Sequence, residues 1–536
     1  MRIRIGNVSK SLTPDPLSHM RMLRSNFLVF VVIGLAVAAI WVVWPLSGPT
    51  STRQAAPKPI QKGDQEIVWL NPATSTVNWE RLVAAARRFH VDRPDLLLDD
   101  SNAFPRQTTA VPELAIAAGP GKPRLWFRWY KMTGDQTTRQ WVQALAHRDP
   151  PPLAIVGGGT SDRARDLARE LNDLPGSAAH KPLMLITSAT ADQIYLYLDE
   201  QEQDLMNIYP GRGFRFCFTN KQMAKAVADF IWSRDDLRPD REPSYLVYWK
   251  DDPYSEDFFD RFREVLSEPD RQVAAGPASA PVSWSIPYSV GSFNEPNRWE
   301  ADVVEQLANV VGQNPEQKRP LLVLPAMPHP ARRFLRGLAR TDPVLTSRFV
   351  VATGDGIDFN TIYRDRNLAW PIQDLPCPLV FFCHRNPVDP IAFREDRQEN
   401  NPAPPNPNER TTTGTQDLLL YRDIVETIVT AAADDAGWQD QPDEICRRIK
   451  EITLPDGDKR FSPKGNTRAA TGVFVVLLKP MREENRVRPQ ATLQVWNGSA
   501  LANHLFRWEL VRELTVDYRN QITSPPPEKG PHDADS

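Results

Sequence analysis

Short apolar runs alternate with amphipathic stretches through the middle of the chain. The apolar run at 153–156 predicts a buried strand, and it leads directly into GGGTS at 157–161. Apolar residues then recur at the i, i+3, i+4 and i+7 spacing of one helix face, namely Ala164, Leu167, Ala168 and Leu171. A second apolar run at 183–186 ends in Thr187-Ser188-Ala189-Thr190. Parallel strands that end in hydroxyl residues at one sheet edge predict a polar ligand crevice.

The same alternation extends in both directions and predicts a parallel α/β sheet protein. Strands are expected at 125–130, 214–218, 245–249, 282–286, 321–324, 349–352 and 379–383. Helices are expected at 79–89, 137–146, 222–232, 299–311, 331–338 and 417–430, with a further helix that Ser255 would cap. Apart from its one helix, the stretch 65–115 gives no readable pattern.

Two alternating series predict two Rossmann-like lobes of the same kind. We expect lobe 1 at 66–220, completed by about 384–450, and lobe 2 at 221–383, completed by about 451–515. The 50 prolines gather in segments without periodicity. We therefore expect a Pro/Ser-rich linker at 47–65, an exposed loop at 386–415 and a disordered tail at 516–536.

An unbroken apolar run precedes the linker. Residues 27–44 are long enough to cross the hydrocarbon layer as a helix, and Trp41 and Trp44 lie where interfacial aromatics would. We therefore predict a transmembrane anchor at 27–46. The basic segment 1–26 would be a cytoplasmic tail, which places the remainder outside the cytoplasm as an extracytoplasmic (periplasmic) domain. A cleaved signal peptide is the alternative.

Composition and short motifs limit the classes of function that this chain could have. The net charge is −3 with acids and bases interspersed, which argues against a nucleic-acid partner. Four cysteines are too few for a disulfide scaffold, so we expect buried thiols, with a single bridge as the alternative. Phosphate-loop, GxSxG, HExxH and metal-ligand spacings are all absent. These patterns predict no metal, no cofactor and no enzymatic activity.

Six segments, in order, resemble the type I periplasmic binding-protein fold, in particular the leucine/isoleucine/valine-binding branch of ABC-transporter substrate-binding proteins. The resemblance covers roughly 115–480. It rests on IVGGGTS (155–161), ITSATAD (186–192), FRFCFTN (214–220), VYWKDDPYSEDF (247–258), VVATGDG (350–356) and FSPKGNTRAATGVFVV (461–476). One departure is the sequence LPAM at 324–327, where the family often places an aromatic residue.

The resemblance also implies a ligand site. Ser161 and Thr190 match first-lobe hydroxyls that hold the ligand carboxylate, and Ala189 matches a small residue whose carbonyl accepts the ligand ammonium group. Tyr254 matches an aromatic residue on the closing lobe, and Asp355 matches the acid that pairs with the ammonium group. Hydroxyls and helix-end donors suit an anion, while a carboxylate on the opposite lobe suits a cation. Each of these residues also has a structural role to consider: we expect the Ser161 hydroxyl to cap its helix, Thr190 and Asp355 could be turn residues, and Tyr254 could be a packed aromatic.

These expectations combine into a functional hypothesis. The chain would be a membrane-anchored solute-binding protein that captures a small polar ligand, an amino acid or similar zwitterion, and delivers it to an ABC permease. A tethered ligand-sensing module and a non-binding scaffold of the same fold are the alternatives. The hypothesis requires Ser161 and Thr190 to face Tyr254 and Asp355 across one gap.

Overall fold

The computed structural model describes residues 58–134, 136–176, 181–195, 202–268, 283–289, 298–357, 376–389, 416–434, 437–438, 440–453, 459–462, 466–468, 472–481, 490–501, 505–517 and 522–523. The predicted cytoplasmic tail and the anchor at 27–46 lie outside these residues, as do most of the predicted loop and C-terminal tail. None of the helices in the described residues has both the length and the apolar character to span a membrane.

Lobe 1 is built on a seven-stranded sheet with the order β2-β3-β4-β1-β5-β6-β9. Its strands are β1 (Gln65–Pro72), β2 (Leu97–Asp99), β3 (Glu113–Ala117), β4 (Arg124–Met132), β5 (Ala154–Gly157), β6 (Leu183–Ile186) and β9 (Gly213–Arg215). The strands from β4 to β9 run parallel, and β2 and β3 form an antiparallel margin. The carboxyl ends of the five parallel strands therefore share one edge.

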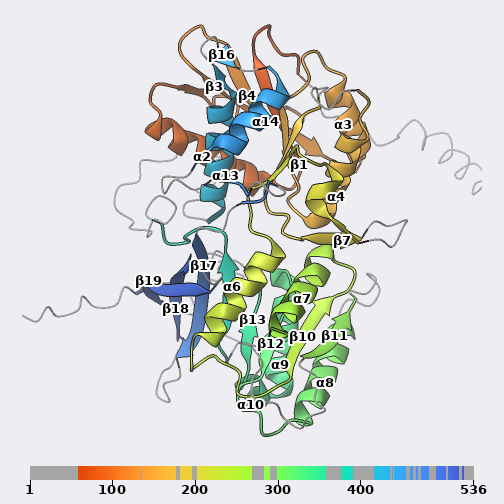
Figure 1. Ribbon diagram of the computed structural model, residues 1–536, viewed down its shortest axis with the longest axis vertical. Helices are drawn as coiled ribbons and strands as arrows, with labels where there is room; N and C mark the ends of the chain where they lie inside the picture. Colours follow the sequence, from red (N-terminus) through yellow and green to blue (C-terminus); the bar gives the residue numbers. More distant parts are fainter. Residues whose placement is uncertain are drawn as a thin grey trace, which may run out of the picture. The chain divides into compact units, whose positions relative to one another are not determined.

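Helices cover both faces of this sheet, because residues of β1 alternate between two apolar layers. Ile67 and Trp69 pack with α2 (Thr76–Asp92), α13 (Gln416–Ala432) and α14 (Pro442–Glu451). Val68 and Leu70 pack with α3 (Thr138–Ala146), α4 (Ser161–Asn172) and the short α5 (Leu205–Ile208). Figure 1 shows α13 and α14, coloured blue, among the orange and yellow elements of lobe 1. Segments from both halves of the sequence thus complete this lobe.

A buried ionic network lies at the amino end of β1. Arg128 donates to Glu66 at 3.2 Å and to Glu113 at 2.9 Å, and Arg148 also pairs with Glu66. Both arginines donate to the backbone carbonyl of Lys58, at 3.2 Å and 2.7 Å, and the Lys58 ammonium group contacts Glu113 at 2.6 Å. Glu66 is fully buried, so its two guanidinium partners offset the cost of burying its charge. The network attaches the segment that precedes β1 to lobe 1.

Lobe 2 is built on a nine-stranded mixed sheet with the order β11-β10-β12-β13-β14-β17-β18-β19-β20. Its strands are β10 (Ser244–Trp249), β11 (Ser283–Tyr288), β12 (Leu321–Val323), β13 (Val350–Ala352), β14 (Leu379–Cys383), β17 (Gly472–Met481), β18 (Gln490–Ala500), β19 (Phe506–Asp517) and β20 (Ile522–Thr523). The first five strands of this order are parallel, and β17 to β20 extend the sheet antiparallel from β14.

Two apolar layers again enclose the sheet. One face packs against α6 (Asn220–Trp232) and α7 (Pro253–Leu266), and Phe258 and Phe262 of α7 are fully buried there. The other face packs against α8 (Arg298–Gly312), α9 (Pro328–Thr341) and α10 (Pro343–Thr346). Two small antiparallel pairs, β7 (Gln193–Tyr195) with β8 (Glu202–Asp204) and β15 (Ala433–Asp434) with β16 (Gly437–Trp438), lie outside the main sheets.

Three crossings connect the lobes, from β9 to α6, from β14 to α13 and from α14 to β17. Backbone hydrogen bonds hold the crossings together: Arg215 N–H donates to the Asn466 carbonyl and Arg468 N–H donates to the Arg215 carbonyl, both at 3.1 Å. The Arg468 guanidinium also donates to the His384 carbonyl at 3.0 Å. The crossings therefore form one hinge rather than three independent linkers.

Several predictions differ from the structure. Strands β1, β2 and β3 occupy the stretch that gave no readable pattern, and the antiparallel extension from β17 to β20 was not expected. The helix α7 begins after Asp252, whose carboxylate accepts from Ser255 N–H at 3.0 Å, so Ser255 is not the cap. Ser255 Oγ instead donates to the Pro325 carbonyl. All four cysteines are buried and free, as predicted, so the disulfide alternative is wrong.

Packing of α7 predicts a large cost for Phe262→Ala. The ring is fully buried, so its removal leaves a cavity and should lower the free energy of unfolding by about 3–5 kcal/mol. Val344→Ala is the control, because Val344 is 75% exposed and its truncation should change stability by less than about 0.5 kcal/mol. Urea unfolding of both variants measures the difference, and equal effects would contradict this account of the core.

Candidate functional site

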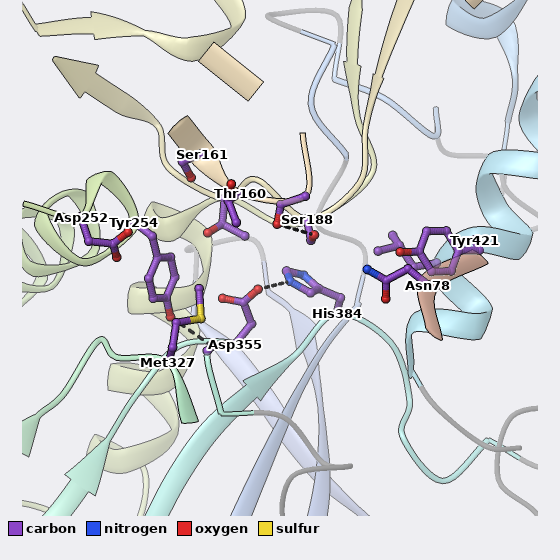
Figure 2. A pocket seen from close by; sticks show the side chains of 14 residues that line it. Asn78, Thr160, Ser161, Ser188, Asp252, Tyr254, Met327, Asp355, His384 and Tyr421 are labelled. Carbon is purple, nitrogen blue, oxygen red and sulfur yellow. Dashed lines mark hydrogen bonds and ion pairs between the residues drawn. The ribbon is translucent and has the colours of Figure 1, made fainter. Parts of the chain in front are cut away.

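A cavity of about 210 Å³ lies where the carboxyl ends of the lobe 1 strands meet lobe 2. Figure 2 shows side chains from both lobes converging on it. Its lining consists of Asn78, Gly159, Thr160, Ser161, Ser188, Thr190, Asp252, Tyr254, Met327, Asp355, Gly356, His384, Leu420 and Tyr421. Four of the five predicted site residues are therefore brought together around one space.

Lobe 1 presents the uncapped N-terminus of α4. Gly158 turns the chain between β5 and α4 in the left-handed region, with φ of +72°, which glycine adopts without a Cβ penalty. The N-cap Thr160 makes no side-chain cap hydrogen bond, whereas Thr137 and Thr219 cap α3 and α6 with full capping boxes. The first N–H groups of α4 and the Thr160 hydroxyl are thus left for another partner, and this end of a helix favours an anion.

Hydroxyl groups surround this helix end. Ser161 Oγ accepts from Ala191 N–H at 3.3 Å, so it does not cap α4 as predicted but keeps its own proton for a further acceptor. Ser188 Oγ donates to the Gly159 carbonyl at 3.1 Å. Thr190 is 1% exposed, and its hydroxyl has no hydrogen-bond partner among the described residues. A buried hydroxyl of this kind is costly unless a ligand or water satisfies it.

Lobe 2 presents a carboxylate and a phenol. Asp355 lies in the turn after β13, and Gly356 N–H donates to the Tyr254 hydroxyl at 3.2 Å. Burial raises the pKa of Tyr254 well above its usual value, and the neighbouring Asp355 carboxylate raises it further. Tyr254 is therefore a neutral hydroxyl at the cavity wall. A Cβ on Gly354 would approach its oxygen to 2.6 Å, so the close packing requires glycine there.

One imidazole connects this carboxylate to the hinge. Phe218 N–H donates to His384 Nδ1 at 3.2 Å, so Nδ1 carries a lone pair and the proton lies on Nε2. Nε2 then donates to the Asp355 carboxylate at 2.8 Å, as the dashed line in Figure 2 shows. In this arrangement the imidazole is neutral. Among the described residues no lysine or arginine pairs with Asp355, so its negative charge remains available to a cation in the cavity.

The lobes also touch beside the cavity. Asp257 of α7 accepts from the backbone N–H groups of Asp192 and Gln193, at 2.7 Å and 3.1 Å, and from the Asn220 side chain at 2.9 Å. Burial, together with the negative charge of Asp192, raises the pKa of Asp257 to about 7. This cross-lobe contact holds the two walls of the cavity close together.

Sequence reasoning missed part of the lining. Asn78 lies in the first turn of α2, the helix that follows β1, and Leu420 and Tyr421 come from α13, so this end of the cavity is assembled from segments far apart in the sequence. No sequence motif pointed to His384, which contacts Asp355. Conversely, the fifth predicted residue, Ala189, is not among the lining residues, and its carbonyl accepts from the Cys217 thiol at 3.3 Å. Within the described residues, no cluster of three or more histidine, cysteine or acidic side chains could hold a metal ion.

Comparison with known proteins supports the fold. No family model and no curated protein match the sequence, but solved structures do. A solute-binding protein of an ABC transporter from R. palustris, in complex with 4-hydroxybenzoate, is similar with a TM-score of 0.50 and 10% identity, over 79% of this chain and 94% of that chain. A leucine-binding protein from Thermotoga maritima has a TM-score of 0.47 and 14% identity, over 84% and 98%. An ABC-transporter substrate-binding protein from Desulfitobacterium hafniense has a TM-score of 0.48 and 13% identity, over 79% and 98%.

Together with the two lobes and three crossings, the R. palustris match confirms the predicted type I periplasmic binding-protein fold. Identities this low show the fold alone. The ligand roles of Ser161, Ala189, Thr190, Tyr254 and Asp355 remain predictions.

The turn that presents α4 predicts a contrast between neighbouring glycines. In Gly158→Ala the new Cβ would lie 2.8 Å from the Ala164 Cβ and 3.2 Å from its Cα, at a positive φ. The free energy of unfolding should fall by about 1–3 kcal/mol. Gly159→Ala is the matched control, because the nearest atom to its Cβ would be the Asn71 side-chain oxygen at 3.6 Å. Urea unfolding measures both, and equal stability of the two variants would contradict the strained turn.

Proposed function

We propose that this chain is a membrane-anchored, extracytoplasmic solute-binding protein that captures a small polar solute, an amino acid or similar zwitterion, for ABC-type transport. The observation that carries the proposal is the opposite polarity of the two cavity walls. An uncapped helix N-terminus with free hydroxyls faces a carboxylate whose partners among the described residues are a neutral imidazole and the neutral Tyr254 phenol. A zwitterion satisfies both walls at once, because its carboxylate suits the helix end and its ammonium group suits Asp355.

Binding by both walls also gives a physical reason for closure. A ligand that contacts both lobes binds the closed arrangement better than the open one, and this difference in affinity drives hinge closure. Binding of a ligand carboxylate has a precedent in this fold, since the R. palustris protein is in complex with 4-hydroxybenzoate, which is itself a carboxylate. That ligand has no cationic group to pair with an acid such as Asp355, so we favour an amino acid.

The anchor and the transporter are the remaining parts of the proposal. The apolar run at 27–44, with basic residues before it, supports attachment to the inner membrane by a helix at 27–46. A permease is the expected partner for a tethered protein of this fold. A sensing module would bind the same ligand, and a non-binding scaffold would bind none.

Asp355→Asn tests the cationic half of the ligand. The amide can still accept from His384 Nε2, so the wall keeps its shape while the charge is lost. Affinity for the amino acid that raises the melting temperature of the full chain most should fall at least about tenfold, measured by calorimetry. Asp235→Asn, at an exposed acid of lobe 2, is the control and should leave affinity unchanged.

Retained affinity in Asp355→Asn would remove the ammonium contact from the proposal. If 4-hydroxybenzoate stabilises the chain and no amino acid does, the solute is an aromatic acid, and the amino-acid proposal is wrong.

Thr190→Val tests the carboxylate half. Replacing a buried, unsatisfied hydroxyl by a methyl group should not lower the stability of the ligand-free chain, while affinity for the amino acid should fall roughly tenfold. Thr353→Val is a matched control, because its hydroxyl is also buried and without a partner among the described residues but does not line the cavity. Calorimetry measures the affinity of both variants. An equal loss of affinity in the two would mean that Thr190 does not contact the ligand.

A further inference from the structure

The proposed zwitterion leaves part of the cavity unexplained. Two carboxylates line it, Asp355 and Asp252, and its lining contains no lysine or arginine. A zwitterion brings one ammonium group and one carboxylate, so it neutralises Asp355 and adds no charge to balance Asp252. Figure 2 shows the Tyr254 ring between the two carboxylates, so they belong to different parts of the wall.

The charge of an acid on the other lobe also acts on Asp252. Burial, together with the negative charge of Asp162 in the first turn of α4, raises the pKa of Asp252 to about 6. Neither carboxylate forms an ion pair with any described residue, and Tyr288 of β11 adds a phenol near Asp252 but no positive charge. The cavity wall at Asp252 therefore carries a negative charge that no cation of the lining balances.

The N-cap role of Asp252 explains only half of its carboxylate. One oxygen, Oδ2, accepts from Ser255 N–H at 3.0 Å and begins α7. Capping does not require a position on the cavity wall, and Asn or Ser would cap as well. The same cavity contains the unpartnered Thr190 hydroxyl, which is an independent sign that a ligand occupies it.

We propose that the solute is a basic amino acid whose side-chain cation pairs with Asp252 while its α-ammonium group pairs with Asp355. This inference rests on the proposed function and names its substrate class. The side-chain cation supplies the positive charge that the cavity lining lacks, so it contributes to affinity. A neutral amino acid would leave the half-buried Asp252 carboxylate without a cationic partner, which makes the cavity selective against it.

The direct test compares L-lysine with L-norleucine, which has the same carbon chain without the terminal amine. Calorimetry on the purified full chain should show L-lysine binding at least about tenfold more tightly than L-norleucine. L-ornithine and L-arginine, titrated in parallel, test whether any side-chain cation suffices.

Asp252→Asn assigns the preference to this residue. Asparagine is an equally good N-cap, so α7 should begin normally and the melting temperature should stay close to that of the parent chain. L-Lysine affinity should fall at least about tenfold, and L-norleucine affinity should change less than about threefold. Asp251→Asn is the matched control, because Asp251 is the exposed neighbouring acid and does not line the cavity.

The outcomes separate this inference from the proposed function. Equal affinity for L-lysine and L-norleucine, unaffected by Asp252→Asn, overturns the basic-amino-acid assignment and leaves amino-acid binding intact. Heat from CaCl₂ or MgCl₂ that disappears in Asp252→Asn, without a preference for L-lysine, assigns Asp252 to a metal ion and also overturns it. No heat with any amino acid overturns both proposals.

Discussion

The hydrogen-bonded chain from Phe218 through His384 to Asp355 is the constraint on which the site depends. Because Phe218 N–H can only donate, it fixes the imidazole in the tautomer that donates to the carboxylate. Arg468 strengthens this arrangement: its guanidinium lies 4.4 Å above the Phe218 ring and donates to the His384 carbonyl. One residue of the hinge thereby sets the orientation of the acid in the cavity.

The arginines of the hinge pair with acids outside the cavity and are absent from its lining. Burial and the nearby Arg385 lower the pKa of Arg468 to about 9, while Arg385, Arg468 and Arg460 keep the pKa of buried Asp423 below its usual value. These charges are satisfied within the hinge itself. The cavity thus receives a carboxylate without a guanidinium partner, and its wall carries the charge that a cationic ligand requires.

The sequence predicted the parallel cores of both lobes well, because apolar strands and amphipathic helices leave strong periodic signals. It failed at β1, where buried Glu66 interrupts the apolar run and is satisfied by Arg128, Tyr130 and Arg148 from distant segments. The antiparallel extension of the lobe 2 sheet was not predicted, because the alternation of residues along β18 and β19 was not recognised as the margin of a sheet. Periodicity reports local burial, and it cannot reveal a charge that tertiary contacts neutralise.

The site was predicted in part for a related reason. Ser161, Thr190, Tyr254 and Asp355 follow strands or begin helices, so their positions at a sheet edge can be inferred from local pattern. His384 and Tyr421 reach the same cavity through a crossing and a late helix, which leave no local signal. Ser161 and Ser255 illustrate the finer limit: helix starts were located within a few residues, but the capping side chain was misassigned in both.

The hydrogen bonds from Arg128 and Arg148 to the Lys58 carbonyl have a mechanical consequence. A tensile load applied to the chain before Lys58 would enter lobe 1 at the amino end of β1, which lies between two parallel neighbours, β4 and β5. Such a load acts in shear across two rows of backbone hydrogen bonds at once. The path of this load does not include lobe 2. Lobe 2 would therefore remain able to rotate about the hinge while lobe 1 is held in place.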